Sequence, residues 1–176
     1  GPPGAGKGTQ SKYLVHKLNN FQISTGDILR EEIKKNSDIG QQITNNMNEG
    51  KFVSDEIVNS LIKKLIDDPL KKNKLIFDGY PRSLSQAKYL DFLLDNSNQK
   101  IGHIFFLNVN KDTIIERIKK RKILENRSDD NTDTILNRYD TYMETTRPVL
   151  DYYSKNLNFH EINGTQEIDQ ITKEIE

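Results

Sequence analysis

The sequence opens with a pattern of glycines and one lysine that strongly restricts how the chain can fold. Residues 1–9 read Gly-Pro-Pro-Gly-Ala-Gly-Lys-Gly-Thr, and Gly1, Gly6 and Lys7 have the spacing of a phosphate-binding P-loop. In such a loop, backbone N–H groups turn toward phosphate oxygens, the following helix adds its positive end, and the lysine reaches the terminal phosphates. The usual pattern has Ser or Thr directly after the lysine, whereas here a glycine intervenes. A flexible glycine-rich tail is the alternative, but a tail does not require this lysine or the amphipathic helix after it.

Apolar residues alternate along the chain between strand-like and helix-like spacing, which is typical of an α/β fold. Short runs rich in β-branched and aromatic residues predict strands buried on both faces at 74–77 and 103–109, and a weaker strand at 158–162. Helical spacing is found at 7–18, 55–66, 84–94, 111–122 and, interrupted by Pro148, at 133–153. We therefore predict a single domain over residues 1–176, a doubly wound parallel sheet with flanking helices.

A P-loop normally follows a strand, and the sequence begins inside the loop. We therefore expect a first strand of a few apolar residues, missing from this sequence, to precede Gly1 as the central member of the sheet. Ligands of such sheets bind at the carboxyl ends of the strands.

The composition argues against several classes of function. Lys plus Arg and Asp plus Glu number 26 each, so no overall charge favours nucleic acid or an anionic membrane. The chain has no cysteine, which excludes disulfides and cysteine-bound zinc and agrees with a reducing compartment. We read no membrane span and no targeting signal, so we expect a cytoplasmic protein. His16, His103 and His160 share no spacing and are expected to be structural.

Arginine is used sparingly, which makes each arginine a candidate for a specific role. The chain has 19 Lys and 7 Arg, and a guanidinium binds a phosphate through two hydrogen bonds as lysine cannot. Arg117 and Arg121 lie four residues apart on one predicted helix, while Arg127 and Arg138 flank the start of the next helix. A solvated basic face is the alternative. Four arginines beside a flap at about 122–131 are better suited to neutralising a transferring phosphoryl group.

Two further segments place charged side chains where a parallel sheet binds ligands. Ser-Thr-Gly-Asp at 24–27 precedes a helix expected from about Ile28, with Arg30 one turn into it, and reads equally well as a helix cap or an anion-binding corner. Asp78 and Arg82 follow the first strongly predicted strand. The carboxylate can hold magnesium, directly or through water, and the guanidinium can clamp a phosphate. A plain turn with an exposed arginine is the alternative.

Together these segments resemble the adenylate kinase family over nearly the whole chain. Gly-Ala-Gly-Lys-Gly-Thr at 4–9 is similar to that family's form of the P-loop, which accounts for the glycine after the lysine. Ser-Thr-Gly-Asp at 24–27, Asp-Gly-Tyr-Pro-Arg at 78–82 and Arg-Ser-Asp-Asp-Asn at 127–131 are similar to its later signatures. Four motifs in the same order make the resemblance specific.

The resemblance implies a donor site for ATP and the residues that form it. Arg117 would contact ATP near its base, Arg121 would contact its phosphates, and Gln166 would meet adenine through its backbone. The residues that would surround the phosphates are Gly4, Ala5, Gly6, Lys7, Gly8 and Thr9.

The resemblance also implies an acceptor site for AMP, partly in a small helical insert at about 24–53 that binds the monophosphate. Arg127 and Arg138 would bridge both nucleotides, and Arg147 has no implied role. The other AMP-binding residues would be Thr25, Arg30, Lys51, Phe52, Val53, Gly79, Tyr80, Pro81, Arg82 and Gln86.

Two features select a subtype within the family. Thr25 and Gln86 match the AMP-selective pattern, whereas UMP/CMP kinases usually carry Ala at the first position and Asn directly after the arginine, where this chain has Ser83. The flap is too short for the extended or zinc-binding lid of many bacterial relatives. The resemblance therefore implies a short-lid monomeric enzyme that transfers phosphate reversibly from MgATP to AMP, giving two ADP, and uses no zinc.

The acceptor phosphate is already ionised at neutral pH, so this mechanism needs no general base. Asp78 would anchor magnesium through water, and the insert and the flap would close to exclude water. The catalytic residues, which would surround the transferring group, are Lys7, Arg82, Arg121, Arg127 and Arg138. The alternatives are a UMP/CMP kinase, a P-loop module that binds nucleotide without turnover, and a chain that does not fold stably without its first strand. The arginine set argues against the second.

Overall fold

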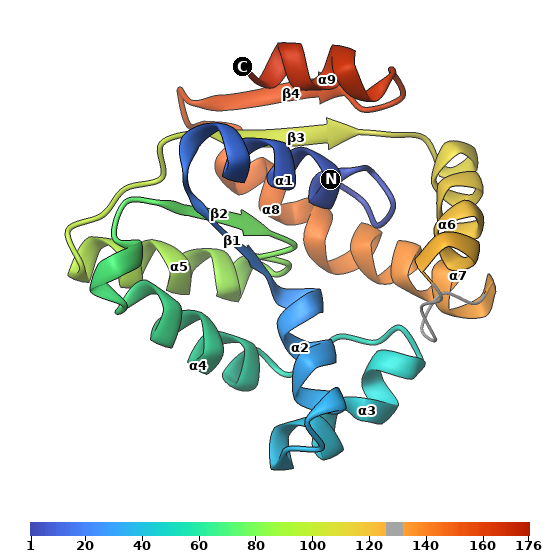
Figure 1. Ribbon diagram of the computed structural model, residues 1–176, viewed down its shortest axis with the longest axis horizontal. Coiled ribbons are helices and arrows are strands. Elements are labelled where there is room, and N and C mark those ends of the chain that lie inside the picture. Colours follow the sequence, from blue (N-terminus) through green and yellow to red (C-terminus); the bar gives the residue numbers. More distant parts are fainter. Residues whose placement is uncertain (126–131) are drawn as a thin grey trace.

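The computed structural model describes residues 1–125 and 132–176 as an α/β fold in which short parallel strands are flanked by helices (Figure 1). The strands are β1 (Phe21–Ser24), β2 (Leu75–Asp78), β3 (Ile104–Asn108) and β4 (Phe159–Asn163). The helices are α1 (Lys7–Leu18), α2 (Thr25–Lys34), α3 (Asp38–Asn48), α4 (Asp55–Ile66), α5 (Leu84–Asn96), α6 (Lys111–Glu125), α7 (Thr132–Thr141), α8 (Arg147–Tyr153) and α9 (Ile168–Ile175). A 3₁₀ turn, η1 (Pro69–Lys71), and a π-helical segment, η2 (Tyr142–Thr146), complete the described elements.

Most predicted elements are confirmed, and the differences have local causes. Helices α1 and α4 have the predicted bounds. Helix α2 begins at Thr25 rather than near Ile28, because Ser24 caps it directly by accepting a hydrogen bond from the Asp27 N–H at 3.3 Å. The predicted helix at 133–153 is divided into α7, η2 and α8, and Pro148 lies in the first turn of α8, where its missing N–H is tolerated. Helices α3 and α9 were not predicted.

The strands form two separate parallel sheets rather than one. Strand β1 pairs with β2, and β3 pairs with β4, whereas the described strands include no hydrogen-bonded neighbour between β2 and β3. A cavity of about 1780 Å³ is lined by residues of both β2 and β3.

The prediction that two strands are buried on both faces is only partly correct. In β3 only Leu107 is fully buried, and all four residues of β2 are partly exposed. Each of these strands has one edge without a partner among the described residues, which leaves its side chains less covered than in a continuous sheet.

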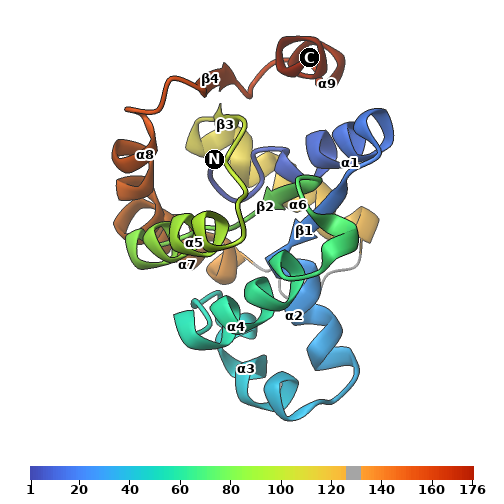
Figure 2. The ribbon, with the colours of Figure 1, turned by 90° about the vertical axis from the view of Figure 1, so that its left-hand side faces the viewer.

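In the described part of the chain, three apolar clusters hold the helices against the strands, and the smallest joins α5 to α8 through Ala87, Val149 and Tyr153. The first joins β1 to helices α2–α5 and includes Ile23, Ile43, Ile62 and Leu90. The second joins β3 and β4 to α6, α7 and α9. In both views of the ribbon, α2 and α3 lie at the opposite end of the molecule from α9 (Figure 2). No helix of the described segments is long and apolar enough to cross a membrane.

The register of the strands brings the motifs to one end of the fold. Ser24 lies opposite Asp78 at the carboxyl ends of β1 and β2, and Asn108 lies opposite Asn163 at the carboxyl ends of β3 and β4. Because the strands are parallel, the segments that follow them leave from the same end of each sheet.

Candidate active site

The first six residues form a tight loop that leads into α1. Gly4 and Gly6 have φ angles of +78° and +96°, in the left-handed region that favours glycine. A Cβ at Gly4 would come within 2.9 Å of the Ile118 side chain, so the loop also approaches α6 too closely for any other residue. Among the described residues, no side chain caps the N-terminus of α1. The N–H groups of its first turn are therefore oriented to bind an anion.

Lys7 lies over this loop and among other charged groups. Its Nζ donates hydrogen bonds to the carbonyl oxygens of Gly1 and Pro2, both at 2.8 Å. The pKa of Lys7 is lowered to about 8, mainly by burial; the carboxylate of Asp78 opposes the shift, and the positive charges of Arg82 and Arg121 add to it. Charged side chains from three separate parts of the chain therefore converge near the P-loop.

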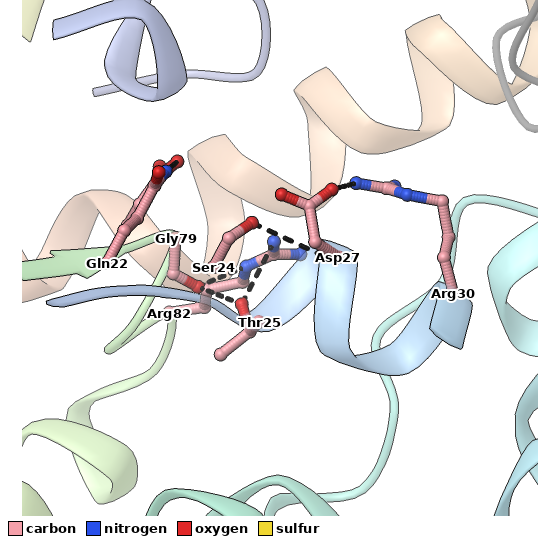
Figure 3. Close-up of polar contacts among 8 residues, drawn as sticks. Gln22, Ser24, Thr25, Asp27, Arg30, Gly79 and Arg82 are labelled. Carbon is pink, nitrogen blue, oxygen red and sulfur yellow. Dashed lines mark hydrogen bonds and ion pairs between the residues drawn. The ribbon is translucent and has the colours of Figure 1, made fainter. Parts of the chain in front are cut away.

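The loop after β2 is joined to the start of α2 by a small hydrogen-bond network (Figure 3). Arg82 Nε donates to the Gly79 carbonyl at 2.7 Å, and its Nη2 donates to Thr25 Oγ1 at 3.4 Å. Thr25 Oγ1 in turn donates to the same Gly79 carbonyl at 2.8 Å. A Cβ at Gly79, whose φ is +73°, would lie 2.9 Å from Arg82 Nη2. Glycine is therefore needed for the arginine to fold back over the loop.

Arg82 is also the centre of a wider cluster of positive charge. Its pKa is lowered to about 10, mainly by burial; the charges of Arg138 and Arg30 contribute to the shift, and Asp78 opposes it. Its guanidinium carbon lies 5.5 Å from the centre of the Phe52 ring, in the range of a cation–π contact. The structure thus brings three of the predicted acceptor-side residues, Arg30, Phe52 and Arg138, from separate segments to the neighbourhood of one guanidinium.

The corner at 24–27 was predicted to be either a helix cap or an anion-binding site. The Ser24 cap confirms the structural interpretation. Arg30 Nη2 forms an ion pair of 2.5 Å with Asp27 Oδ1, which holds the guanidinium at the N-terminal end of α2 (Figure 3). A helix N-terminus and a guanidinium together are suited to an anion.

Asp78 lies at the end of β2, and its carboxylate interacts with the charges of both Lys7 and Arg82. Its Oδ2 accepts a hydrogen bond from Gln22 Nε2 at 2.9 Å, and a Cβ at Gly8 would lie 3.4 Å from the same oxygen. Residues 1–125 and 132–176 contain no cluster of three acids or histidines that could hold a metal alone. One carboxylate beside a phosphate loop fits Mg²⁺, which takes its other ligands from nucleotide phosphates and water.

On the donor side, Arg117 links the P-loop to the turn after β4. Its Nη1 donates to the Gly164 carbonyl at 2.7 Å and to the Ala5 carbonyl at 3.5 Å. Gln166, two residues beyond Gly164, directs its own side chain to Glu174 at 3.0 Å, which leaves the contact predicted for it to its backbone. The structure therefore brings together the two residues predicted to lie near the ATP base.

Helix α7 contacts the end of α3 and the segment that follows it. Thr134 Oγ1 donates to the Asn48 carbonyl at 3.0 Å, and Asn137 Nδ2 donates to the Glu49 carbonyl at 3.2 Å. A Cβ at Gly50 would lie 3.2 Å from the side chain of Arg138. The predicted insert therefore packs directly against the helix that carries one of the predicted catalytic arginines.

Two residues predicted to bind AMP have structural contacts here. Lys51 Nζ is paired with Glu49 at 2.6 Å on the surface, and Val53 is buried in the first apolar cluster.

The prediction of a flap at 122–131 needs one correction, because residues 122–125 form the last turn of α6. The remaining part of the flap and Arg127 lie outside the described residues.

Sequence reasoning missed Asp55 and Asn59, which form hydrogen bonds with the predicted residues Gln86 and Tyr80. Gln86 Oε1 accepts from the Arg82 backbone N–H at 2.7 Å, and Gln86 Nε2 donates to Asp55 Oδ1 at 2.7 Å. The Tyr80 hydroxyl, next to the cis peptide bond to Pro81, donates to Asn59 Oδ1 at 2.7 Å. In the sequence, Asp55 is indistinguishable from an ordinary acid in the first turn of a helix, so no local signal points to this role.

Comparisons with known proteins agree with this geometry. The sequence profile of the adenylate kinase family matches residues 1–158. A protein named adenylate kinase from Pelagibacter ubique is 46% identical over 201 residues, covering 99% of this chain and 94% of that protein. Proteins of the same name from Mycoplasma capricolum and Nocardioides sp. are 40% and 36% identical, covering 93% and 99% of this chain and 89% and 92% of their own lengths. The match extends over nearly the whole chain, and this chain belongs to the adenylate kinase family.

Proposed function

We propose that this protein catalyses the reversible transfer of a phosphoryl group from MgATP to AMP, giving two ADP, and thereby keeps the adenine nucleotides in balance. One observation carries the proposal: a phosphate-binding loop with Lys7 and a second cationic loop with Arg82 are close enough for the charge of Arg82 to lower the pKa of Lys7, and the Asp78 carboxylate acts on both side chains. Relatives named adenylate kinase that match the chain almost end to end support it.

The chemistry of this site is positioning and neutralisation of charge. We assign Lys7, Arg82, Arg121 and Arg138 to the transferring phosphoryl group, because their positive charges are close enough to interact and an anion among them would offset their repulsion. Arg127 is assigned to the same group on the family resemblance alone. A phosphate acceptor ionised at neutral pH requires no general base from the protein.

Each nucleotide is assigned to one side of this charge cluster. The loop at 4–9, with Arg117, Arg121 and the backbone of Gln166, forms the ATP side. On the AMP side, Gly79 to Arg82 and Arg30 would hold the phosphate, while Thr25 and Gln86 would read the base, together with the 51–53 segment. Arg138 lies where the insert meets α7 and is assigned to both nucleotides.

Magnesium is the cofactor that these residues fit. Asp78 would hold it, directly or through water, beside the phosphates of ATP, where its charge would offset the negative charge of the donor. Gln22 fixes the carboxylate by a hydrogen bond, and Lys7, held over the P-loop, would contact the same phosphates.

The short lid is supported by the lengths of the alignments. The match with the Pelagibacter protein runs over 201 positions, more than the 176 residues of this chain, so that protein carries at least 25 residues that this chain lacks. The match with the Nocardioides protein runs over 175 positions. We place these additional residues of the Pelagibacter protein in its flap, at the position of 122–131 in this chain. The monophosphate-binding insert is assigned to about 24–53. We also expect a monomer located in the cytoplasm, and the lack of cysteine supports this location.

The reverse reaction separates this function from its alternatives. With Mg²⁺ and ADP as the only nucleotide, the protein should form ATP and AMP in equal amounts, measured by chromatography of the quenched reaction. A UMP/CMP kinase has no suitable acceptor pair in this mixture, and a binding module makes no product. If no ATP forms at a concentration of ADP that saturates the enzyme, the proposal is refuted.

A further inference from the structure

The side chain of Gln86 is held in one orientation by two partners of opposite kind. It is 3% exposed, and its amide oxygen and amide nitrogen each have a partner at 2.7 Å. The partner of the oxygen is the Arg82 backbone N–H, which can only donate a hydrogen bond. The partner of the nitrogen is the Asp55 carboxylate, which can only accept one when ionised. Rotating the amide by 180° would place its N–H groups against the Arg82 N–H and its oxygen against the Asp55 carboxylate.

Asp55 is itself fixed by the segment that carries Gln86. Its Oδ2 accepts hydrogen bonds from the hydroxyls of Ser83, at 3.0 Å, and Ser85. Ser83 also caps α5 by accepting the Gln86 N–H at 3.2 Å. The carboxylate on α4 is therefore bound to three side chains at the start of α5, which leaves it little freedom to move away from the Gln86 amide.

The amide held in this way retains hydrogen-bonding capacity for a ligand. A carbonyl oxygen has two lone pairs and an amide nitrogen has two N–H groups, so each atom of Gln86 keeps one position after its contact with the protein. An amide that presents one acceptor and one donor is complementary to adenine, whose 6-amino group donates and whose adjacent ring nitrogen, N1, accepts. In a 6-oxopurine such as hypoxanthine both polarities are reversed.

We propose that Asp55 is a positioning residue that fixes the Gln86 amide and thereby makes the acceptor site select 6-aminopurine over 6-oxopurine nucleoside monophosphates. The inference rests on the proposed function, because it requires AMP to bind beside Gln86. Arg82 contributes the other half of the restraint through its backbone N–H, which no substitution other than proline removes. Asp55 is therefore the partner whose effect can be tested.

The first test replaces the carboxylate by an amide of the same size. Asparagine at position 55 can donate as well as accept, so Asp55→Asn removes the restraint on the Gln86 nitrogen. With saturating MgATP we expect kcat/KM for AMP to fall about tenfold, mainly through KM, as for loss of a buried charge-assisted hydrogen bond. For inosine monophosphate (IMP) it should fall less or rise, which reduces the AMP:IMP ratio at least about fivefold, while KM for ATP is unchanged. Inhibition constants replace kcat/KM if turnover of IMP is too slow.

A matched control and a double-mutant cycle separate positioning from stability. Glu56→Gln removes an exposed charge from the same turn of α4 and should leave the ratio unchanged. In a Gln86→Ala background, Asp55→Asn should change the AMP:IMP ratio less than twofold, because there is no amide left to orient. If Asp55→Asn melts early, Asp55→Ser, which can also donate and accept, takes its place.

An Asp55→Asn enzyme with the wild-type AMP:IMP ratio would overturn the inference, as would an equal change in the ratio with and without Gln86. A wild-type protein that does not turn over AMP would instead refute the proposed function, so the two failures are distinguishable.

Discussion

The Thr25 hydroxyl accepts a hydrogen bond of 3.4 Å from the Arg82 guanidinium, although 57 positions separate the two residues in the sequence. Both side chains also donate to the carbonyl oxygen of Gly79, at 2.8 and 2.7 Å. This contact is possible because Ser24 and Asp78 are register partners at the ends of β1 and β2. The pairing of two short strands thus joins the start of the insert to the loop that carries the central arginine.

Arg82→Ala should reduce turnover of AMP with MgATP at least ~100-fold, since removing one preorganised charge stabiliser has effects of this size. The measurement is kcat in an assay of ADP formation at saturating substrates. Arg147→Ala is the matched control, because Arg147 is exposed and has no assigned role, and it should stay within about twofold of the wild type. A loss below tenfold for Arg82→Ala would contradict its assignment.

The activity of the free enzyme should decline in mildly alkaline solution. The pKa of Lys7 is lowered to about 8, so its ammonium is lost as the pH rises through that value and kcat/KM for MgATP should fall tenfold per pH unit above it. Bound phosphates favour the charged form, so the corresponding decline in kcat should appear at higher pH. Lys7→Arg, slower but permanently charged, should lack the decline near pH 8. A wild-type profile that is flat to pH 10 would show that the charge of Lys7 is not required.

Thr25→Val should weaken the acceptor site alone. Valine keeps the shape of threonine but loses the hydroxyl that contacts Gly79 and Arg82, so we expect KM for AMP to rise about tenfold while KM for ATP is unchanged. Ser60→Ala removes a hydroxyl that bonds only to its own helix in the described contacts and should have no effect on either constant. Equal increases in both KM values for Thr25→Val would point to general loss of structure instead.

Gly50→Ala should destabilise the contact between the insert and α7. Gly50 has a φ of +73°, and a Cβ there would lie 2.8 Å from the Thr134 carbonyl oxygen. We expect the free energy of unfolding, measured in urea, to fall by about 1–3 kcal/mol. Gly102→Ala is the control, because no described atom lies within 4 Å of its added Cβ, and it should change stability by less than about 0.5 kcal/mol. Equal effects of the two substitutions would remove the special role of Gly50.

The P-loop and the strand ends could be predicted because their signals are local. The glycines and Lys7 have a fixed spacing, and Asp78 directly follows an apolar run, so both positions are determined within a few residues of sequence. The split into two sheets was not predicted, because strand pairing depends on contacts between distant segments. The same reason explains His103 and His160, which share no spacing but have ring nitrogens 3.3 Å apart, because β3 and β4 are neighbours.

The residues behind the site were missed for a related reason. Asp55 and Gln22 act on Gln86 and Asp78 across 31 and 56 positions, and each looks ordinary in its own segment. The ion pair of Arg30 with Asp27 is local, yet its relation to Arg82 depends on how α2 follows β1. The sequence identifies groups that contact substrates by their chemistry, whereas groups that position them emerge only from the fold.

The most direct test of the account is the acceptor dependence of phosphoryl transfer. ADP formation from MgATP by the purified protein should be measured with AMP, CMP, UMP or no acceptor, each at equal concentration. We predict rapid turnover with AMP, at most slow turnover with CMP or UMP, and none without an acceptor. Preferential turnover of CMP or UMP would contradict the assignment of Thr25 and Gln86 to adenine, and tight binding of ATP without turnover of any acceptor would contradict the enzymatic function itself.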